Sequence, residues 1–318
     1  MKAEPAEGRA HAKIILVGEH AVVYGFPAIV APLGNLGAVA RVQPHTGPMV
    51  LASRYGISGL DRAPQPVTGL RHLTVATLRA LGGAPSNLRL SIEATIPPGV
   101  GLGSSAAVAI ALVRALYRAH RRPLEVERLV RLAEIGERFA HGVPSGLDLW
   151  AASSATPLWF VRGRPPTRLT VSRPLAMVVA NSGVPSQTRV AVDRVRQRLR
   201  VARRPTWSEL EHLGTLARAM REALSTGEVE RVGSVFTEAH RALEAVGVGH
   251  PATSHLAACA ARAGALGAKT TGGGLGGSVV AVARDMAHAC HLREALLAAG
   301  AAAAWTTRLG GVQDGEDA

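Results

Sequence analysis

The residues from Ile96 to Ala107, IPPGVGLGSSAA, limit the possible folds of this chain more than any other stretch. Just before them, from Leu88 to Ile96, apolar and polar residues alternate, which predicts a β-strand with one buried face. Two prolines end this strand, and three glycines between residues 99 and 103 then allow tight turns and close approach of the backbone to a ligand. The run from Ala106 to Tyr117 carries no charge before Arg114 and predicts a buried helix.

The start of that helix is a candidate anion site, because its first N–H groups and the positive end of its dipole favour negative charge. A Walker-type loop would place lysine after the last glycine, where this chain has Ser104. A dinucleotide fingerprint would need an acidic residue at the end of a second strand, whereas Glu125 lies in a helical pattern. A plain turn would explain the glycines alone, but two serines whose hydroxyls can reach phosphate or Mg²⁺ favour a nucleotide.

The length and composition narrow the class of protein. A chain of 318 residues can bury a sizeable core, and two domains are the natural expectation. The formal net charge of +13 would suit a nucleic-acid partner, but it comes almost entirely from arginine. Arginine in place of lysine along the whole chain indicates a compositional bias. We therefore predict no nucleic-acid partner, only an electrostatic preference for anionic substrates.

The expected compartment is the cytoplasm. Cys259 and Cys290 show no metal-binding spacing, which is typical of a protein in a reducing environment. The N-terminus has no pattern of a signal peptide, and no apolar run reaches the length of a membrane span. We therefore predict no membrane partner.

Several charged or polar residues stand next to apolar runs, which marks them as candidates for a site. Lys13 lies in a short apolar strand, where a lysine that faces water from a sheet edge is the common alternative. Glu19 and His20 follow that strand, and a solvated turn would also explain them. Asp148 follows a turn rich in glycine and proline, where a helix cap is the ordinary role of an aspartate.

Glu137 breaks the pattern of a helix predicted over residues 124–139. Val126, Val130 and Ala133 form the apolar stripe of this helix, and Glu137 continues the same stripe. Burial of a lone carboxylate is costly unless the group is paired or bound to a metal. A metal ligand and a partner of a buried arginine are therefore both open interpretations.

A second glycine-rich block, residues 269–278, has five glycines among its six residues from 272 to 277. Glycine is costly in an ordered fold, so close approach of the backbone to a ligand is the expected reason for it. A flexible linker is the alternative. A helix predicted over 257–267 and a strand predicted over 279–283 argue against it.

Five segments, in this order, resemble the GHMP small-molecule kinases: residues 13–25, 97–106, 141–148, 181–188 and 269–278. Each motif alone is weak, but five in the order of the family, across nearly the whole chain, are specific. Residues 21–25, AVVYG, are most similar to the members that act on mevalonate.

The resemblance implies an α+β fold of two domains with the active site between them. Residues 1–173 are expected to form a domain like ribosomal protein S5 domain 2, with the phosphate-binding loop and the catalytic residues. Residues 174–318 are expected to form a ferredoxin-like domain that carries the second glycine block. The family also implies a homodimer.

The resemblance also implies roles for individual residues. Asp148 corresponds to the catalytic base and Lys13 to the lysine beside it, whose charge would offset that of the attacking oxygen. The residues expected to bind Mg²⁺ are Ser105 and Glu137, and those expected to contact the substrate or the reacting phosphoryl group are Glu19, His20 and Thr188. The residues expected to hold ATP are Pro98, Gly99, Val100, Gly101, Leu102, Gly103, Ser104 and Ser105, with Gly272, Gly273 and Gly274.

The implied reaction transfers the γ-phosphoryl group of ATP to the 5-hydroxyl of mevalonate, with Mg²⁺ as cofactor. The nearest alternatives are family members that act on phosphomevalonate, galactose or homoserine. A non-catalytic ligand sensor on the same fold is a further alternative, but such a sensor would be free to lose Lys13, Glu137 and Asp148. Two departures from the family concern the second glycine block, where Leu275 replaces a glycine and Ser278 a cysteine.

Overall fold

The computed structural model describes residues 4–59, 68–83, 87–141 and 146–310. The chain divides into two compact units, each made of segments that are separate in the sequence. The first unit comprises residues 1–13, 34–98 and 103–155, and the second comprises residues 14–33, 99–102 and 156–318. A single domain boundary between residues 173 and 174 stays a prediction.

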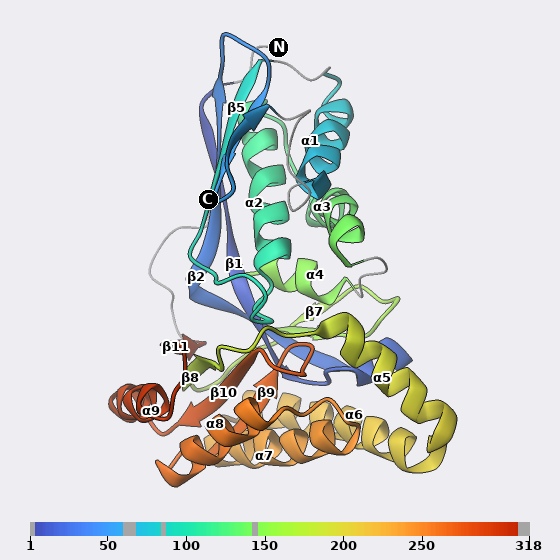
Figure 1. The fold of residues 1–318 in the computed structure, drawn as a ribbon, viewed down its shortest axis with the longest axis vertical. Coiled ribbons are helices and arrows are strands. Elements are labelled where there is room, and N and C mark those ends of the chain that lie inside the picture. The colour runs from blue at the N-terminus through green and yellow to red at the C-terminus, as the bar shows by residue number, and fades with distance from the viewer. Residues whose placement is uncertain (1–3, 60–67, 84–86, 142–145, 311–318) are drawn as a thin grey trace. The chain divides into compact units, whose positions relative to one another are not determined.

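The first unit contains a sheet and four helices (Figure 1). Its strands are β1 (Ala6–Val17) and β2 (Ala28–Pro44), both of which continue into the second unit, with β3 (Val50–Ser53), β4 (Gly56–Gly59) and β5 (Leu88–Ala94). Its helices are α1 (Thr68–Ala80), α2 (Ser104–Ala119), α3 (Val126–His141) and α4 (Leu147–Ser153). Strand β5 pairs with β2 in antiparallel fashion and with β3 in parallel fashion.

Helix α2 is the centre of the first unit and lies between the sheet and the pair α1 and α3 (Figure 1). Eleven of its sixteen residues are buried, as expected for a helix that is apolar on nearly all sides. The strand and the buried helix predicted on either side of the glycine loop are therefore confirmed as β5 and α2. Val126 was expected in the core, but it is 39% exposed because it lies in the first turn of α3.

The second unit contains a four-stranded antiparallel sheet in the order β11-β8-β10-β9. These strands are β8 (Leu175–Asn181), β9 (Gly267–Thr271), β10 (Ser278–Ala283) and β11 (Ala303–Leu309). The helices are η1 (Ala21–Tyr24), α5 (Thr188–Val201), α6 (Arg203–Thr226), α7 (Val229–Ala245), α8 (Pro251–Arg262) and α9 (Met286–Ala298). Two short strands, β6 (Leu158–Phe160) and β7 (Thr167–Arg168), pair with each other, and β6 pairs with the first residues of β2.

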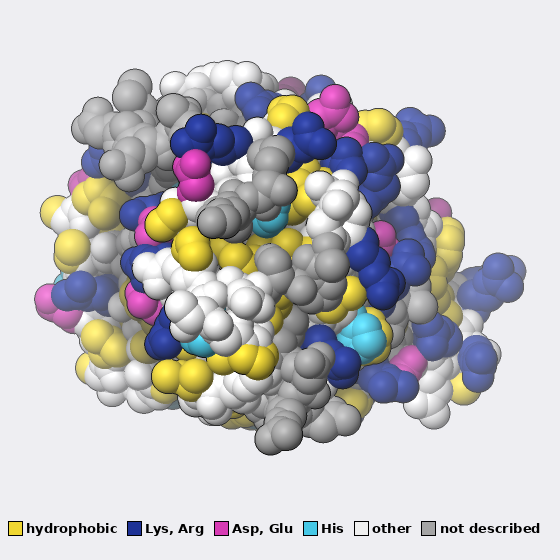
Figure 2. All heavy atoms as spheres, turned by 90° about the horizontal axis from the view of Figure 1, so that it is seen from above, with side chains coloured by type: hydrophobic (Ala, Val, Ile, Leu, Met, Phe, Trp, Pro, Cys, Tyr) yellow, Lys and Arg dark blue, Asp and Glu magenta, His cyan; other side chains and the backbone are white. Residues whose placement is uncertain are grey.

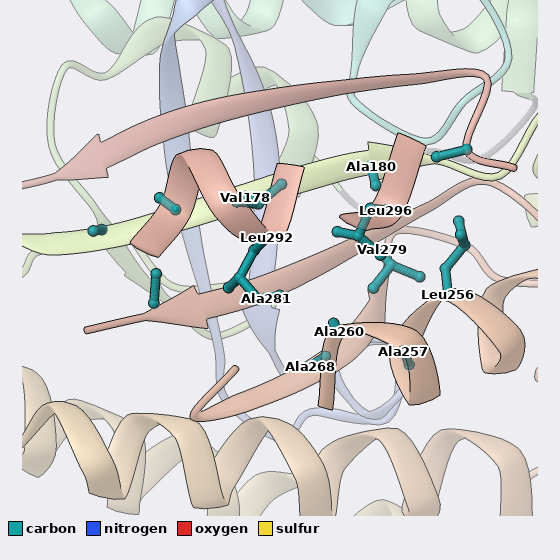
Figure 3. Close-up of a cluster of buried hydrophobic side chains, with 14 residues drawn as sticks. Val178, Ala180, Leu256, Ala257, Ala260, Ala268, Val279, Ala281, Leu292 and Leu296 are labelled. Atoms are coloured by element: carbon teal, nitrogen blue, oxygen red, sulfur yellow. The ribbon is translucent and has the colours of Figure 1, made fainter. Parts of the chain in front are cut away.

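Helices α8 and α9 cover one face of this sheet (Figure 3). Val178 and Ala180 on β8 face the same side as Val279 and Ala281 on β10, because alternate residues of a strand share a face. Leu292 and Leu296 of α9 pack against them in the same buried cluster. The alternation of apolar residues thus builds the core of the second unit.

The helix predicted over residues 257–267 is wrong at both ends. Helix α8 begins at Pro251, after His250 accepts a hydrogen bond from the backbone N–H of Ala252, and it ends at Arg262. Residues 267–271 form strand β9 instead. An alanine-rich run favours helix by propensity, but pairing of β9 with β10 determines the structure here.

The described helices include none with the length and apolar content of a membrane span. Figure 2 shows lysine and arginine side chains on several parts of the visible face, among acidic, polar and apolar ones. This distribution agrees with a general excess of arginine and gives no single basic patch on the face shown.

Candidate active site

Lys13 and Asp148 form an ion pair in the first unit, with 3.0 Å between Lys13 Nζ and Asp148 Oδ1. The side chain of Lys13 is only 3% exposed, so it is not a lysine that faces water from a sheet edge. Asp148 lies in the first turn of α4, and its side chain remains 41% exposed. A buried cation therefore holds a carboxylate that solvent or a ligand can still reach.

Gly103 makes room for the lysine of this pair. A Cβ atom at Gly103 would lie 2.8 Å from Cγ of Lys13, closer than real contacts allow. Its φ of +74° also lies in the left-handed region, which favours glycine. The last glycine of the loop is thus required both by the backbone and by the path of the Lys13 side chain.

Ser105 and Glu137 also lie together in the first unit. The hydroxyl of Ser105, in the first turn of α2, donates a hydrogen bond to Oε1 of Glu137 on α3. Glu137 is 3% exposed, as its place on the apolar stripe predicted. The described residues contain no group of three or more His, Cys, Asp or Glu side chains arranged to hold a metal. A carboxylate and a hydroxyl side by side nevertheless fit Mg²⁺, which typically takes one or two carboxylates and completes its shell with phosphate and water oxygens.

In the second unit, Glu19 is paired with Lys269, a residue that the sequence did not single out. Nζ of Lys269 donates to Oε1 of Glu19, and both side chains are almost fully buried. Nζ also donates to the backbone oxygens of Ile15, at 3.3 Å, and of Thr270, at 2.6 Å. The available signal was a rare lysine at the start of the second glycine block, in a chain with only three lysines.

His20 lies in a strained turn next to this pair. Its φ and ψ are 60° and −46°, and the N–H of Ala21 donates to the oxygen of Glu19 at 2.6 Å. These values describe a γ-turn with positive φ, which is rare and strained. Strain of this kind concentrates at functional sites, which supports a role for residues 19 and 20.

The ring of His20 is neutral near pH 7. Burial lowers its pKa to about 4, although the hydrogen bond to the backbone of Gly273 opposes this change. Nε2 of His20 lies 2.9 Å from the oxygen of Gly273. Since a carbonyl oxygen only accepts, Nε2 carries the proton and Nδ1 is an acceptor.

The second unit also brings three of the sequence motifs together around residues 99–102. The N–H of Ser186 donates to the oxygen of Gly99 at 2.7 Å. The hydroxyl of Ser278 donates to the oxygen of Val100 at 3.0 Å, so the serine at this position has a defined contact. The glycine loop is thus supported by the segment 181–188 and by the second glycine block.

Gly273 links two of the expected substrate residues. Besides its bond to His20, its Cα lies so close to Thr188 that an added Cβ would come within 2.1 Å of Thr188 Oγ1. Leu275 follows in the same block with a φ of 53°, in the left-handed region, and is buried. The glycine-like conformation expected at this position is therefore adopted by a leucine.

The structure thus forms two groups of the predicted residues, each within one unit. The first unit pairs Lys13 with Asp148 and Ser105 with Glu137, while the second connects Glu19, His20, Thr188 and Gly273. Of the remaining predicted residues, Leu102 is buried, Ser104 begins α2, and Pro98 and Gly99 are exposed. Residues 142–145, which belong to the motif at 141–148, lie outside the described residues.

Family models match both halves of the chain. The GHMP kinases N terminal domain matches residues 70–155, and the GHMP kinases C terminal domain matches residues 220–304. The mevalonate kinase of Aeropyrum pernix is 32% identical over 294 residues, which covers 88% of this chain and 89% of that protein. The mevalonate kinase of Pyrococcus abyssi is 30% identical and covers 86% and 87%.

Solved structures show the same fold. Mevalonate kinase from methicillin-resistant Staphylococcus aureus has a TM-score of 0.75 at 30% identity, with 97% of this chain and 100% of that chain covered. The L. major mevalonate kinase in complex with R-mevalonate has a TM-score of 0.82 at 24% identity, with 95% of each chain covered.

Proposed function

The chain belongs to the GHMP kinase family, and we propose that it is a mevalonate kinase, which transfers the γ-phosphoryl group of ATP to the 5-hydroxyl of mevalonate. The products are 5-phosphomevalonate and ADP. The observation that carries this proposal is the ion pair of Lys13 and Asp148, in a chain that is 32% identical to a mevalonate kinase along almost its whole length.

Asp148 would act as the base. Its exposed carboxylate can accept the proton of the 5-hydroxyl as the hydroxyl oxygen forms its bond to the γ-phosphorus and the bond to the β-phosphate oxygen breaks. Lys13, whose Nζ lies 3.0 Å from Asp148 Oδ1, would stabilise the negative charge that develops on the attacking oxygen. Because Lys13 is buried, its charge is poorly screened by water and acts strongly on its partner.

The ATP phosphates would bind the backbone of residues 98–105, with the first N–H groups of α2 directed at negative charge. Ser105 and Glu137 would hold Mg²⁺, which offsets phosphate charge when it is bound. Gly272, Gly273 and Gly274 would also contact ATP through their backbone. Gly272 lies so close to Gly101, and Gly273 so close to Thr188, that a Cβ at either position would collide.

His20 and Thr188 would contact the substrate, and Glu19, which is 1% exposed and paired with Lys269, would act through the turn at His20. The neutral ring of His20 offers Nδ1 as a hydrogen-bond acceptor, which suits a substrate hydroxyl better than a carboxylate. This chemistry agrees with a substrate that carries a hydroxyl group, as mevalonate does. We also retain a homodimer and a cytoplasmic location as proposals, and light scattering of the purified protein would test the first.

A coupled assay for ADP, with mevalonate, phosphomevalonate, galactose and homoserine at equal concentrations, tests the proposal. We expect ADP release that depends on mevalonate and on Mg²⁺. Turnover with another of these substrates in place of mevalonate would refute the assignment. A protein that binds mevalonate but releases no ADP would be the non-catalytic sensor.

A further inference from the structure

Lys269 is fully buried on strand β9, which is a rare location for a lysine. Its ammonium group has three N–H donors, and the structure provides three acceptors: Glu19 Oε1, Ile15 O and Thr270 O. The ring of Phe236, on α7, adds a contact with its centroid 5.8 Å from Nζ. The site is therefore built around this one cation.

Such a pair is a poor means of stabilising a fold. Removing two charges from water costs several kcal/mol each, and well-packed apolar residues of similar size often give equal or greater stability. The pair therefore calls for a reason other than stability. Its location suggests one, because Glu19 directly precedes the strained turn at His20.

Strand β9 holds the segment that carries this turn at several points. The hydroxyl of Thr271 accepts from the N–H of Ile15 at 2.9 Å and donates to its oxygen at 3.0 Å. Lys269 holds the oxygen of Ile15 and the carboxylate of Glu19, and the oxygen of Gly273 holds the ring of His20. The end of β1 and the turn after it are thus fixed to strand β9 and to Gly273, two residues beyond its end.

We propose that Lys269 is a positioning residue, which through Glu19 holds the turn so that the His20 ring is presented to the substrate. This proposal rests on the proposed function of His20 as a substrate contact. Lys269 itself touches neither ATP nor the phosphoryl group in this scheme. Its loss should therefore weaken use of mevalonate and leave use of ATP almost unchanged.

The test compares Lys269→Met with the double variant Lys269→Met/Glu19→Gln. The single variant leaves a buried carboxylate without its cation, so it is expected to be unstable and is not sufficient alone. The double variant removes both charges at nearly constant volume and should fold. The matched control is Arg231→Met/Glu222→Gln in the same unit, which removes an ion pair of 2.9 Å between partly exposed side chains and the longer contact of Arg231 with Glu228 at 3.6 Å.

In the folded double variant, we expect the KM for mevalonate to rise by about tenfold or more, while the KM for ATP changes less than about twofold. The control should keep both constants. A double variant that melts like the wild type and keeps its KM for mevalonate would show that the pair is only structural, which overturns the proposal. An equal loss for ATP and mevalonate would overturn it as well.

A second measurement does not depend on turnover. NMR of protein labelled with ¹⁵N-histidine, with His20→Gln to identify the resonance, reports the protonation of the His20 ring. In the wild type we expect Nε2–H, neutral down to about pH 4. In the double variant the ring should titrate closer to its ordinary pKa of 6.5, because it is no longer held in place. An unchanged His20 titration overturns the positioning role, even if the wild type proves inactive with mevalonate and the proposed function fails.

Discussion

The burial of His20 makes the stability of the protein depend on pH in a way that can be calculated. Its pKa falls from 6.5 in the unfolded chain to about 4 in the folded protein, chiefly because burial disfavours the charged ring. Between these values the unfolded state binds a proton that the folded state does not. The contribution of neutral His20 is therefore fully present above pH 6.5 and is lost as the pH falls towards 4.

The size of the effect follows from the difference in pKa. At 1.36 kcal/mol for each pKa unit, the change from 6.5 to about 4 corresponds to about 3 kcal/mol of unfolding free energy. This is a large part of the 5–15 kcal/mol that is typical of a folded protein. The slope should approach 1.4 kcal/mol for each pH unit in the middle of the range.

Urea denaturation of the wild type and of His20→Gln at several pH values between 7.5 and 4 measures this contribution. Glutamine can donate from Nε2 to the oxygen of Gly273 but does not titrate, so the difference between the two free-energy curves isolates His20. The pKa of His240 is also lowered by burial, but this residue is present in both proteins and its effect cancels. His255→Gln, at an exposed position on α8, is the matched control. Parallel curves for the wild type and His20→Gln over the whole range would refute the reasoning.

Three further predictions concern the first unit. Asp148→Asn should fold normally but lose about two to four orders of magnitude in turnover with mevalonate, because the base is removed; activity close to that of the wild type would exclude this role. Glu137→Gln should weaken the use of Mg²⁺-ATP and raise the Mg²⁺ concentration needed for half-maximal kinase activity, because a proposed ligand of the metal is lost, whereas Glu134→Gln, on the polar face of the same helix, should not. Gly103→Ala should abolish activity by displacing the lysine side chain, while Gly82→Ala, which has a similar positive φ but open space around it, should cost only about 1–2 kcal/mol in a thermal melt.

Patterns within one segment predicted the local structure well. The alternation before the glycine loop gave β5, the uncharged run after it gave α2, and the place of Glu137 on an apolar stripe gave its burial. In each case apolar residues recur with the period of a helix or a strand because one face of the element is buried. This period can be recognised within a short stretch of sequence. The roles of the predicted site residues stay predictions, since the structure gives their positions and not their chemistry.

Patterns within one segment could not predict contacts between segments that are distant in the sequence. Lys13 and Asp148 are far apart in the chain, and only the resemblance to a family suggested that they meet. Sequence patterns do not single out Lys269, because the run before it predicts a helix that ends at residue 267, whereas pairing with β10 makes residues 267–271 a buried strand. A lysine on a strand is expected to face water, and two of the three acceptors that allow its burial come from the distant residues 15 and 19.

Leu275 shows how tertiary packing can decide a position that sequence reasoning leaves open. A non-glycine residue in the left-handed region costs about 1–2 kcal/mol, which argues for glycine there. Burial of a leucine side chain contributes about 1.5–3 kcal/mol, and Leu275 is 6% exposed. Its N–H also donates to the oxygen of Val248 at 2.8 Å, which fixes the backbone. The leucine can therefore adopt a conformation that favours glycine, because burial offsets the strain that its Cβ introduces.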